Sequence, residues 1–561
     1  MLIRILIIVF TILYQNTVYS KTTDSNEFNH RYLSNYFSAI LSYDNQDNES
    51  AIKFFNSSKY LLDKHDKFLK HYVFSLVEDG KVLKAIRQIK NLKKKNNTDF
   101  FEAKLLIILD FIKKKNFKDA DKILQELKNY QDIGTYEFII YETIKSYNDL
   151  FLKKKIKKKE QNFGKLSLIT NTLQNCYLNS SKTETLFSNI IDPEYGDYSR
   201  YLFFYTSHLI DNNKIAKVKQ ISSDIDPLDS GLLILQLKHW IDHSNYQKVN
   251  NYFSCNNETD LLGEFFYLIS NLYSSEEVFK KSNFYLQISI FLNPKFDFNY
   301  SLIVENYFLN KNYHLSKKAL EKIDNNNKIY NWYKIKKIGQ IILEEKNQEQ
   351  SLNYIKNNFK KIKSPSLKIL YDMGNIHKKF KKYDKAIEYY SSVLSKVESG
   401  QDAYAEVLFR RGGSYERIGD YKKSDSDLLK SLEINPGEPY VLNYLAYSWL
   451  ERKHNIEKAI DMLKEAYEQE EDDPYIIDSI GWGYYLIGDY INAEKLLKKA
   501  VQLMPDDPVV NDHYGDILWM LDRKLQAKYF WKSVLTLDKT EDKMKKDILN
   551  KLIYGLNKFN S

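Results

Sequence analysis

Cysteine, proline and glycine are all scarce in this sequence of 561 residues, which contains 2 Cys, 9 Pro and 18 Gly. Two cysteines cannot build the disulfide framework of a small secreted domain, and the sequence has no CxxC motif for metal or redox chemistry. The low proline and glycine content disfavours turn-rich β-sandwiches and favours long helices. Because the chain is too long for one ordinary core, we expect several domains or an open-ended array of repeats.

Motifs for catalysis are also missing. There is no GxSxG elbow, no phosphate-binding glycine loop and no paired Cys and His. His239 and His243 lie one helical turn apart in HWIDH, but the glutamate that a zinc peptidase needs directly after the first histidine is replaced by Trp240. We therefore expect these histidines to flank a buried face, and we predict no enzyme activity, no cofactor and no metal site.

Charge of one sign does not dominate any large part of the chain. There are 83 Lys and Arg against 74 Asp and Glu, and the two signs are interleaved almost everywhere. Such interleaving argues against a nucleic-acid-binding role despite the net charge of +9. The run FLKKKIKKKE at 151–160 is predicted to be a solvated helix end or a linker.

The first twenty residues, MLIRILIIVFTILYQNTVYS, have the pattern of a secretory signal peptide. Arg4 precedes an apolar run at 5–13 that is too short to span a bilayer. Val18 and Ser20 occupy the −3 and −1 positions of a cleavage site. The sequence predicts export to the periplasm or cell envelope, without the cysteine of a lipoprotein near the site and without a later transmembrane segment. An uncleaved anchor is the alternative.

A repeat with a period of about 34 residues runs through most of the chain. A small or equivalent residue recurs at steps of 34 to 38, at Ser270, Val304, Gly339, Gly374, Gly412, Ala446, Gly481 and Gly515. In most of these repeats a second small residue follows twelve positions later, as Ala493 follows Gly481. An earlier set, Ala39, Val73 and Ile108, has alanines at the same offset. This spacing predicts helix hairpins that meet at small residues and must stack to bury their faces.

This pattern resembles the tetratricopeptide repeat (TPR), and the last repeats resemble those of exported proteins of Gram-negative bacteria of the alphaproteobacterial type. The resemblance implies an all-α fold, a right-handed superhelical solenoid of stacked hairpins. It also implies a scaffold for protein–protein interaction. Some such relatives are lipoprotein adaptors that dock a processing protease onto cell-wall hydrolases.

The expected divisions follow from the strength of the repeat signal. They are a signal peptide (1–20), an N-terminal TPR-like array (21–150), the basic run (151–162), degenerate helical hairpins (163–259), a C-terminal TPR array (260–540) and a capping helix (541–561). Cys176 and Cys255 fall in different repeats of this arrangement. Since stacked repeats lie farther apart than the ~7 Å between Cα atoms that a disulfide allows, we predict two buried free thiols.

In TPR proteins the first helix of each hairpin lines a concave groove through positions one turn apart. In the last three repeats these positions hold aromatic side chains and three carboxylates, which would favour a partner segment with apolar anchors and Lys or Arg. The predicted groove consists of Tyr440, Asn443, Tyr447, Tyr475, Asp478, Trp482, Tyr485, Asp512, Asp516 and Trp519. The competing interpretation is that Asp478 and Asp512 cap helix starts after Pro474 and Pro508.

The sequence thus predicts an exported, non-catalytic scaffold or adaptor that binds a partner protein in this groove. One alternative is an adaptor that docks an envelope protease or a cell-wall hydrolase. The other is an envelope-structural protein that binds glycan.

Overall fold

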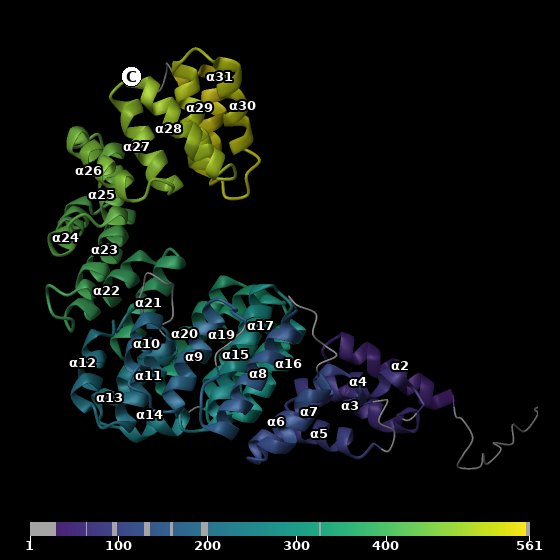
Figure 1. Cartoon of the computed structure of the whole chain (residues 1–561). Helices are drawn as coiled ribbons and strands as arrows, with labels where there is room; N and C mark the ends of the chain where they lie inside the picture. The colour runs from purple at the N-terminus through teal and green to yellow at the C-terminus, as the bar shows by residue number, and fades with distance from the viewer. Residues whose placement is uncertain are drawn as a thin grey trace, which may run out of the picture. The chain divides into compact units, whose positions relative to one another are not determined.

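The computed structural model describes residues 30–62, 64–92, 98–127, 135–157, 161–191, 200–324 and 327–556, and the predicted signal peptide lies outside these ranges. The described residues form thirty α-helices and two short 3-10 helices, with no strand (Figure 1). Residues up to 345 form α2(His30–Asp44), α3(Asn48–Ser57), η1(Lys59–Leu61), α4(Asp66–Glu78), α5(Val82–Lys90), α6(Phe101–Lys113), α7(Phe117–Glu126), α8(Tyr136–Lys153), α9(Lys165–Tyr177), α10(Thr183–Ile191), α11(Arg200–Asp211), α12(Ile215–Asp224), α13(Leu232–Asp242), α14(Tyr246–Tyr252), α15(Glu258–Ser275), α16(Phe279–Leu292), η5(Asp297–Asn299), α17(Tyr300–Leu309), α18(Tyr313–Leu320) and α19(Lys328–Glu345).

The remaining helices continue the same alternation of paired helices. They are α20(Gln348–Phe359), α21(Leu367–Lys379), α22(Tyr383–Leu394), α23(Asp402–Arg417), α24(Tyr421–Ile434), α25(Pro439–Glu451), α26(Ile456–Gln469), α27(Pro474–Leu486), α28(Tyr490–Leu503), α29(Pro508–Met520), α30(Lys524–Val534) and α31(Asp542–Tyr554). The predicted all-α solenoid of helix hairpins is therefore confirmed.

The recurring small residue marks the point where the two helices of a hairpin touch. A Cβ atom added to Gly515 would lie 2.5 Å from the Trp531 ring, and one added to Gly481 would lie 2.8 Å from Leu497 Cγ. In both hairpins the obstructing residue lies sixteen positions downstream, on the second helix. The small residue is thus required by close packing of the helices and not by a ligand.

The weaker N-terminal repeats pack in the same way. The predicted small or apolar positions Ala39, Val73 and Ile108 have no exposed surface, and neither do the alanines twelve residues after each of them. They lie in the hairpins α2/α3, α4/α5 and α6/α7. The period therefore identified core positions even where the rest of the repeat signature is degenerate.

The chain divides into two compact units. Unit 1 comprises residues 1–225 and 231–334, and unit 2 comprises residues 226–230 and 335–561. This boundary falls inside the range 260–540 that was assigned to a single C-terminal array. The short segment Asp226–Ser230 belongs to unit 2 because Leu228, which is fully buried, packs into the core around α21, α22 and α23.

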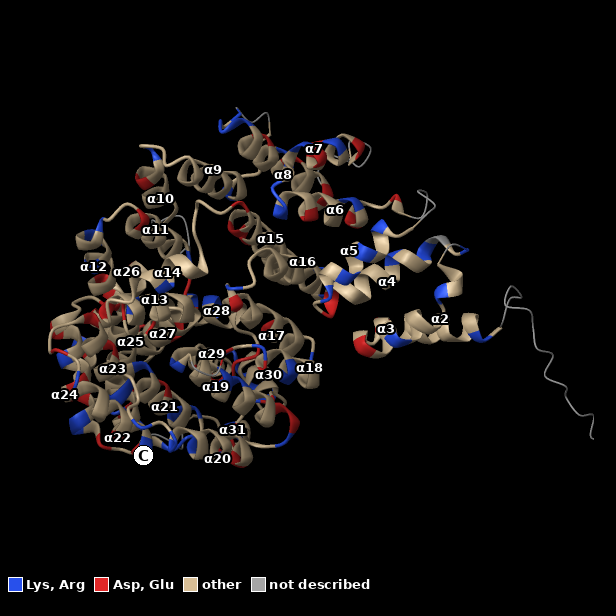
Figure 2. Cartoon of the chain, turned by 90° about the horizontal axis from the view of Figure 1, so that it is seen from below, with Lys and Arg blue, Asp and Glu red and all other residues tan. Residues whose placement is uncertain are grey.

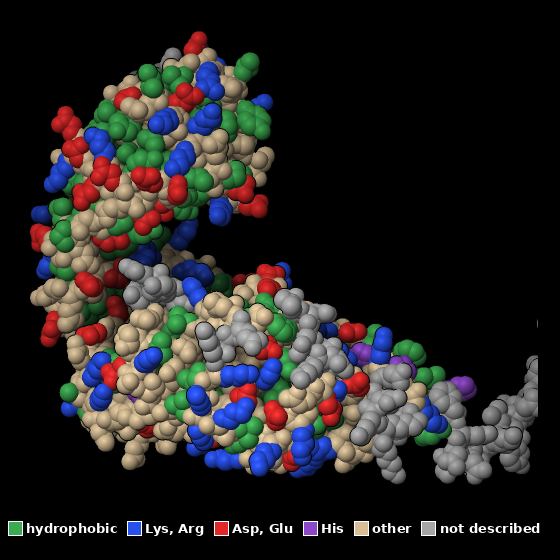
Figure 3. Space-filling view, viewed as in Figure 1, with side chains coloured by type: hydrophobic (Ala, Val, Ile, Leu, Met, Phe, Trp, Pro, Cys, Tyr) green, Lys and Arg blue, Asp and Glu red, His purple; other side chains and the backbone are tan. Residues whose placement is uncertain are grey.

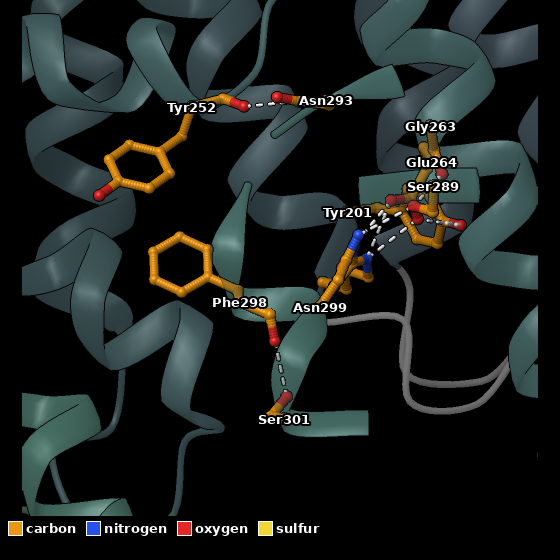
Figure 4. A network of polar contacts seen from close by, with 10 residues as sticks. Tyr201, Tyr252, Gly263, Glu264, Ser289, Asn293, Phe298, Asn299 and Ser301 are labelled. Atoms are coloured by element: carbon orange, nitrogen blue, oxygen red, sulfur yellow. Dashed lines mark hydrogen bonds and ion pairs between the residues drawn. The ribbon is translucent and has the colours of Figure 1, made fainter. Parts of the chain in front are cut away.

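A buried ion pair joins distant helices in the core of unit 1. Arg200, at the start of α11, donates to Glu264 on α15 through Nε (2.9 Å to Oε1) and Nη2 (2.7 Å to Oε2). Nη2 also donates to Asn299 Oδ1, and Asn299 in turn donates to Ser289 Oγ. Figure 4 shows Glu264, Asn299 and Ser289 converging on this network. Because the pair is buried, its hydrogen bonds must all be satisfied for it to be tolerated.

The prediction of two free thiols was wrong, because Cys176 and Cys255 form a disulfide with their Cα atoms 5.6 Å apart. Cys176 lies near the end of α9, but Cys255 lies in the connection between α14 and α15. The expectation that stacked repeats lie too far apart for a disulfide applies to residues within helices. A connecting segment can approach the end of a helix more closely. In addition, α15 packs against α9 and not only against its sequence neighbours.

Charged residues of both signs are distributed along the helices, as Figure 2 shows. None of the helices described above combines the length and the apolar character that crossing a bilayer would need.

Candidate partner-binding groove

The predicted groove residues lie on three first helices, α25, α27 and α29, which begin in the same way. Each starts with proline at the first or second helical position, preceded by a carboxylate cap. Glu438, Asp473 and Asp507 accept hydrogen bonds from backbone N–H groups of the first turn. These residues are the caps, so Asp478 and Asp512 do not cap their helices and the competing interpretation was wrong.

The first turn of each helix carries an exposed apolar side chain. Tyr440 is 47% exposed, Tyr475 is 57% exposed and Val509 is 39% exposed. They occupy equivalent positions of three successive repeats, and we call them the first-turn row. Large apolar side chains that recur at one repeat position without being buried are typical of an interaction surface.

One turn further, the groove carboxylates are already paired within the protein. Asp478, which is 5% exposed, contacts Nδ1 of His513 at 2.9 Å. Burial opposes protonation of His513, but the charge of Asp478 outweighs it and raises the pKa of the imidazole above its ordinary value. The Asn443 side-chain oxygen at the same level is buried and has no hydrogen-bond partner within the described part of the chain.

The next turn of the groove helices carries a stack of aromatic rings. The Trp482 ring lies parallel to His513 with centroids 4.1 Å apart, and its other neighbour Tyr485 stacks at 4.6 Å. Trp482 Nε1 donates to Glu451 Oε1 at 3.0 Å. Tyr447 contacts His513 with ring centroids 6.4 Å apart. The rings of Trp482, Tyr485 and Tyr447 are half-buried and His513 is buried, so they form a supported base of the groove and not free anchors.

Lys551 of α31 neutralises the carboxylates of the last repeat. Its Nζ lies 2.7 Å from Asp512 Oδ1 and 2.8 Å from Asp516 Oδ2. Asp516 also accepts a hydrogen bond from Trp531 Nε1 at 3.0 Å. Burial, and then the charge of Asp512, raise the pKa of Asp516 to about 6, while Lys551 opposes this rise. The expected acidic character of the groove is therefore largely cancelled by the protein's own cations.

Trp519, the last predicted groove residue, is covered by the C-terminal end of the chain. Its ring centroid lies 5.2 Å from that of Trp531, and Gly555 lies directly against it, so a Cβ at Gly555 would collide with the ring. Whether the ten predicted residues bind a partner stays a prediction. Of those ten, Tyr440 and Tyr475 are the exposed members, and both belong to the first-turn row.

Two residues that shape this region, His513 and Lys551, were not predicted from the sequence, whereas Val509 falls on the same groove-lining repeat position as Tyr440 and Tyr475. His513 follows the predicted Asp512 directly, so its approach to Asp478 depends on the packing between α27 and α29. Lys551 lies on the predicted capping helix. Its positive charge, on a helix expected to cover the last repeat, was the signal that could have indicated its pairing with Asp512 and Asp516.

His239 on α13 and His243, which directly follows that helix, lie close together. The rings of His239 and His243 have centroids 4.3 Å apart, and His243 Nδ1 lies 2.8 Å from the His239 carbonyl oxygen. No group of three His, Cys, Asp or Glu side chains that could hold a metal ion occurs in the described ranges.

A family model identifies part of this array. The model described as tetratricopeptide repeat matches residues 367–395 and 405–438. These two matches coincide with the hairpins α21/α22 and α23/α24. The chain contains tetratricopeptide repeats. The groove helices α25, α27 and α29 continue the same tetratricopeptide period toward the C-terminus.

Similar proteins carry the same repeat. Over 123 residues the chain is 30% identical to a TPR repeat-containing protein of Pseudomonas aeruginosa, covering 21% of this chain and 21% of the relative. The match thus spans about a fifth of that protein. Among solved structures, a tetratricopeptide repeat protein from Parabacteroides merdae is 17% identical, with a TM-score of 0.32. The alignment covers 40% of this chain and 88% of the Parabacteroides protein. A thermophilic TPR protein of Thermus thermophilus is 18% identical, with a TM-score of 0.30. The alignment covers 34% of this chain and 100% of the Thermus protein.

Proposed function

We propose that this protein is an exported, non-catalytic scaffold that binds an extended or helical segment of a partner protein along the first-turn row of its C-terminal repeats. The observation that supports the proposal best is the recurrence of Tyr440, Tyr475 and Val509 at one repeat position, all exposed. The fold does not need large apolar side chains there, because the core is filled by other residues of the same helices. Figure 3 shows hydrophobic side chains among charged ones on the visible face of the C-terminal helices.

The internal pairing of the carboxylates changes the expected chemistry of the partner. With Asp478 paired to His513, and Asp516 to Lys551, the groove offers little free negative charge. Binding therefore depends on apolar anchors more than on Lys or Arg of the partner. Salt dependence of binding should be weak, since screening acts mainly on exposed charges.

Export is supported by the sequence of the first twenty residues together with the disulfide. Disulfides persist in oxidising compartments such as the bacterial periplasm and are rare in the cytosol. The Cys176–Cys255 bond is therefore consistent with an exported protein. A fusion of residues 1–30 to a reporter enzyme that is active only after export tests this directly: activity supports export, and an inactive cytosolic fusion contradicts it.

The binding proposal is tested by quantitative affinity capture from envelope fractions. The bait is the full exported chain, compared with a Tyr440→Ser/Tyr475→Ser variant and with a Tyr529→Ser control, in which an exposed tyrosine on α30 (69% exposed) is changed. Truncation of an aromatic anchor at a protein interface commonly costs ~2 kcal/mol or more, which is at least a 30-fold loss of affinity. A partner retained equally by both variants would refute the first-turn row as the binding surface.

A further inference from the structure

A cavity of about 460 Å³ lies within unit 1. One wall comes from the turn between α2 and α3 and from the end of α4, and the other comes from α16, α17 and α18. Gln287 Nε2 donates to the Glu78 carbonyl oxygen at 3.4 Å, across 209 residues of sequence. Asn312 Nδ2 donates to Gln46 Oε1 at 3.4 Å, across 266 residues. The cavity is therefore built where the first hairpins pack against helices much later in the chain.

Glu78 is a buried carboxylate at this cavity, and it has no cation as a partner. It is 6% exposed, and it accepts hydrogen bonds from two neutral groups, the Tyr43 hydroxyl at 2.8 Å and Asn48 Nδ2 at 3.3 Å. No Lys, Arg or His of the described ranges forms an ion pair with it, and Lys280 pairs with Asp44 instead, at 3.3 Å. Burial raises the pKa of Glu78 to about 7. A bound cation would supply the counter-charge that the carboxylate lacks.

Two further oxygen atoms at the cavity accept no hydrogen bond. Asn48, which is 6% exposed, has a buried side-chain oxygen without a partner in the part of the chain that the structure describes. The Tyr307 hydroxyl, on the opposite wall, likewise has no hydrogen-bond partner among the described residues. Burial, and then the charges of Glu78 and Asp79, raise the pKa of the Tyr307 hydroxyl, so this hydroxyl lies close to Glu78. Because a buried acceptor without a donor is costly, these oxygens indicate a ligand that donates.

The other charged groups of the cavity are paired with each other or are exposed. Glu49 lies 3.5 Å from Lys318, which joins α3 to α18. Asp79 pairs with Lys81, the next residue but one. The exposed members of the walls are Asp47, His314 and Lys322. Glu78 is thus the buried carboxylate of this cavity whose charge the surrounding residues leave without a partner.

These acceptors match the donors of a primary ammonium group. Such a group has three N–H donors and no acceptor, and the cavity offers the Glu78 carboxylate, Asn48 Oδ1 and the Tyr307 hydroxyl oxygen. An anion would be repelled by the carboxylate and would leave these oxygens without donors. A metal ion fits less well, because no group of three His, Cys, Asp or Glu side chains in the described ranges could hold one.

We infer that the cavity at Glu78 binds an alkylammonium group, with the ionised Glu78 carboxylate as its counter-ion. The ammonium group belongs either to a free amine or to a lysine side chain of a partner, since both carry the same donors. This inference does not rest on the proposed function, because the cavity lies in unit 1 and the first-turn row lies in unit 2.

The test is a calorimetric titration of the full exported chain with n-butylamine. Near pH 7.5 we expect binding to one site, at least about tenfold tighter than that of tetramethylammonium, which has the charge but no N–H donor. The affinity should fall by on the order of tenfold or more between about pH 7.5 and pH 5.5, because the amine must then displace the proton of Glu78. Titrations in buffers with different ionisation enthalpies should detect that released proton in the unmodified protein.

A titration with lysine blocked at its α-amino and α-carboxyl groups identifies the source of the ammonium group. Tighter binding of blocked lysine than of n-butylamine supports a partner's side chain as the natural ligand. Tighter binding of n-butylamine supports a free amine.

Variants locate the site. Glu78→Gln should weaken amine binding by on the order of tenfold or more and remove its pH dependence, since the counter-charge and the titrating group are both lost. The control Glu49→Gln, which removes an exposed charge from the same cavity, should change the affinity less than about threefold. His314→Gln should leave the pH dependence unchanged.

Three results would overturn the inference: no saturable binding of either amine, equal binding of tetramethylammonium, or a pH dependence that persists in a folded Glu78→Gln variant. If that variant does not fold, the absence of proton release from the unmodified protein below pH 7 decides against it. None of these results bears on the first-turn row, which the envelope capture tests separately.

Discussion

Reduction of the Cys176–Cys255 disulfide should destabilise unit 1 selectively. The bond closes a segment with a sequence separation of 79 residues. In the chain-entropy treatment, a loop of this size stabilises the folded state by about 4 to 5 kcal/mol, because the crosslink restricts the unfolded chain. Since stability in repeat arrays is a sum of local terms, the loss should be confined to the helices that the bond joins.

The assay is hydrogen exchange followed by mass spectrometry, with and without a reductant. Peptides from α9 to α15 should lose protection on reduction, while peptides from α23 to α30 in unit 2 should not change. A Cys176→Ser/Cys255→Ser variant should show the reduced pattern and no response to the reductant. Alkylation of the denatured, unreduced protein should label neither cysteine. Two labelled thiols, or unchanged protection of α9 to α15 after reduction, would refute the reasoning and restore the free-thiol prediction.

Three further predictions concern buried groups. Glu264→Gln should destabilise unit 1 by about 3 to 5 kcal/mol in denaturant unfolding, because it leaves Arg200 buried without its counter-charge. Burial raises the pKa of Glu78 from 4.5 to about 7. The folded state therefore keeps this proton over a pH range where the unfolded state has lost it, and unit 1 should lose up to about 3 kcal/mol as pH rises from 4.5 to 7. Glu78→Gln should remove that slope, and an unchanged slope would show that other groups cause it. Gly515→Ala should lower the melting temperature of unit 2, because its Cβ would lie 2.5 Å from Trp531 and overpacking costs about 1 to 3 kcal/mol, more than the helix propensity gained. An unchanged or raised melting temperature would contradict that packing argument.

Much of the fold could be predicted from the sequence because each hairpin repeats one local requirement. Gly481 and Gly515 face a large side chain sixteen residues later, and this contact depends only on residues within a single repeat. The N-terminal alanines were identified for the same reason. The repeat period and the positions of the small residues predict contacts between segments that are close in sequence, and most contacts in a solenoid are of this kind.

The features that were missed depend on contacts between distant segments. The disulfide requires the connection before α15 to reach the end of α9. The pairing of Asp516 with Lys551 requires α31 to pack beside α29, 35 residues away in the sequence. No periodic signal encodes such contacts, so the pairing of the groove carboxylates with His513 and Lys551 could not be predicted from the sequence.

The most direct test of the scaffold account is site-specific photocrosslinking in intact cells. A photoreactive phenylalanine analogue is placed at Tyr440, at Tyr475 or, as the control, at Tyr529, and crosslinked proteins are identified by mass spectrometry. The account predicts that Tyr440 and Tyr475 crosslink to the same envelope protein, through neighbouring stretches of its sequence, and that Tyr529 does not. A partner captured from Tyr529 but from neither groove position would contradict the account.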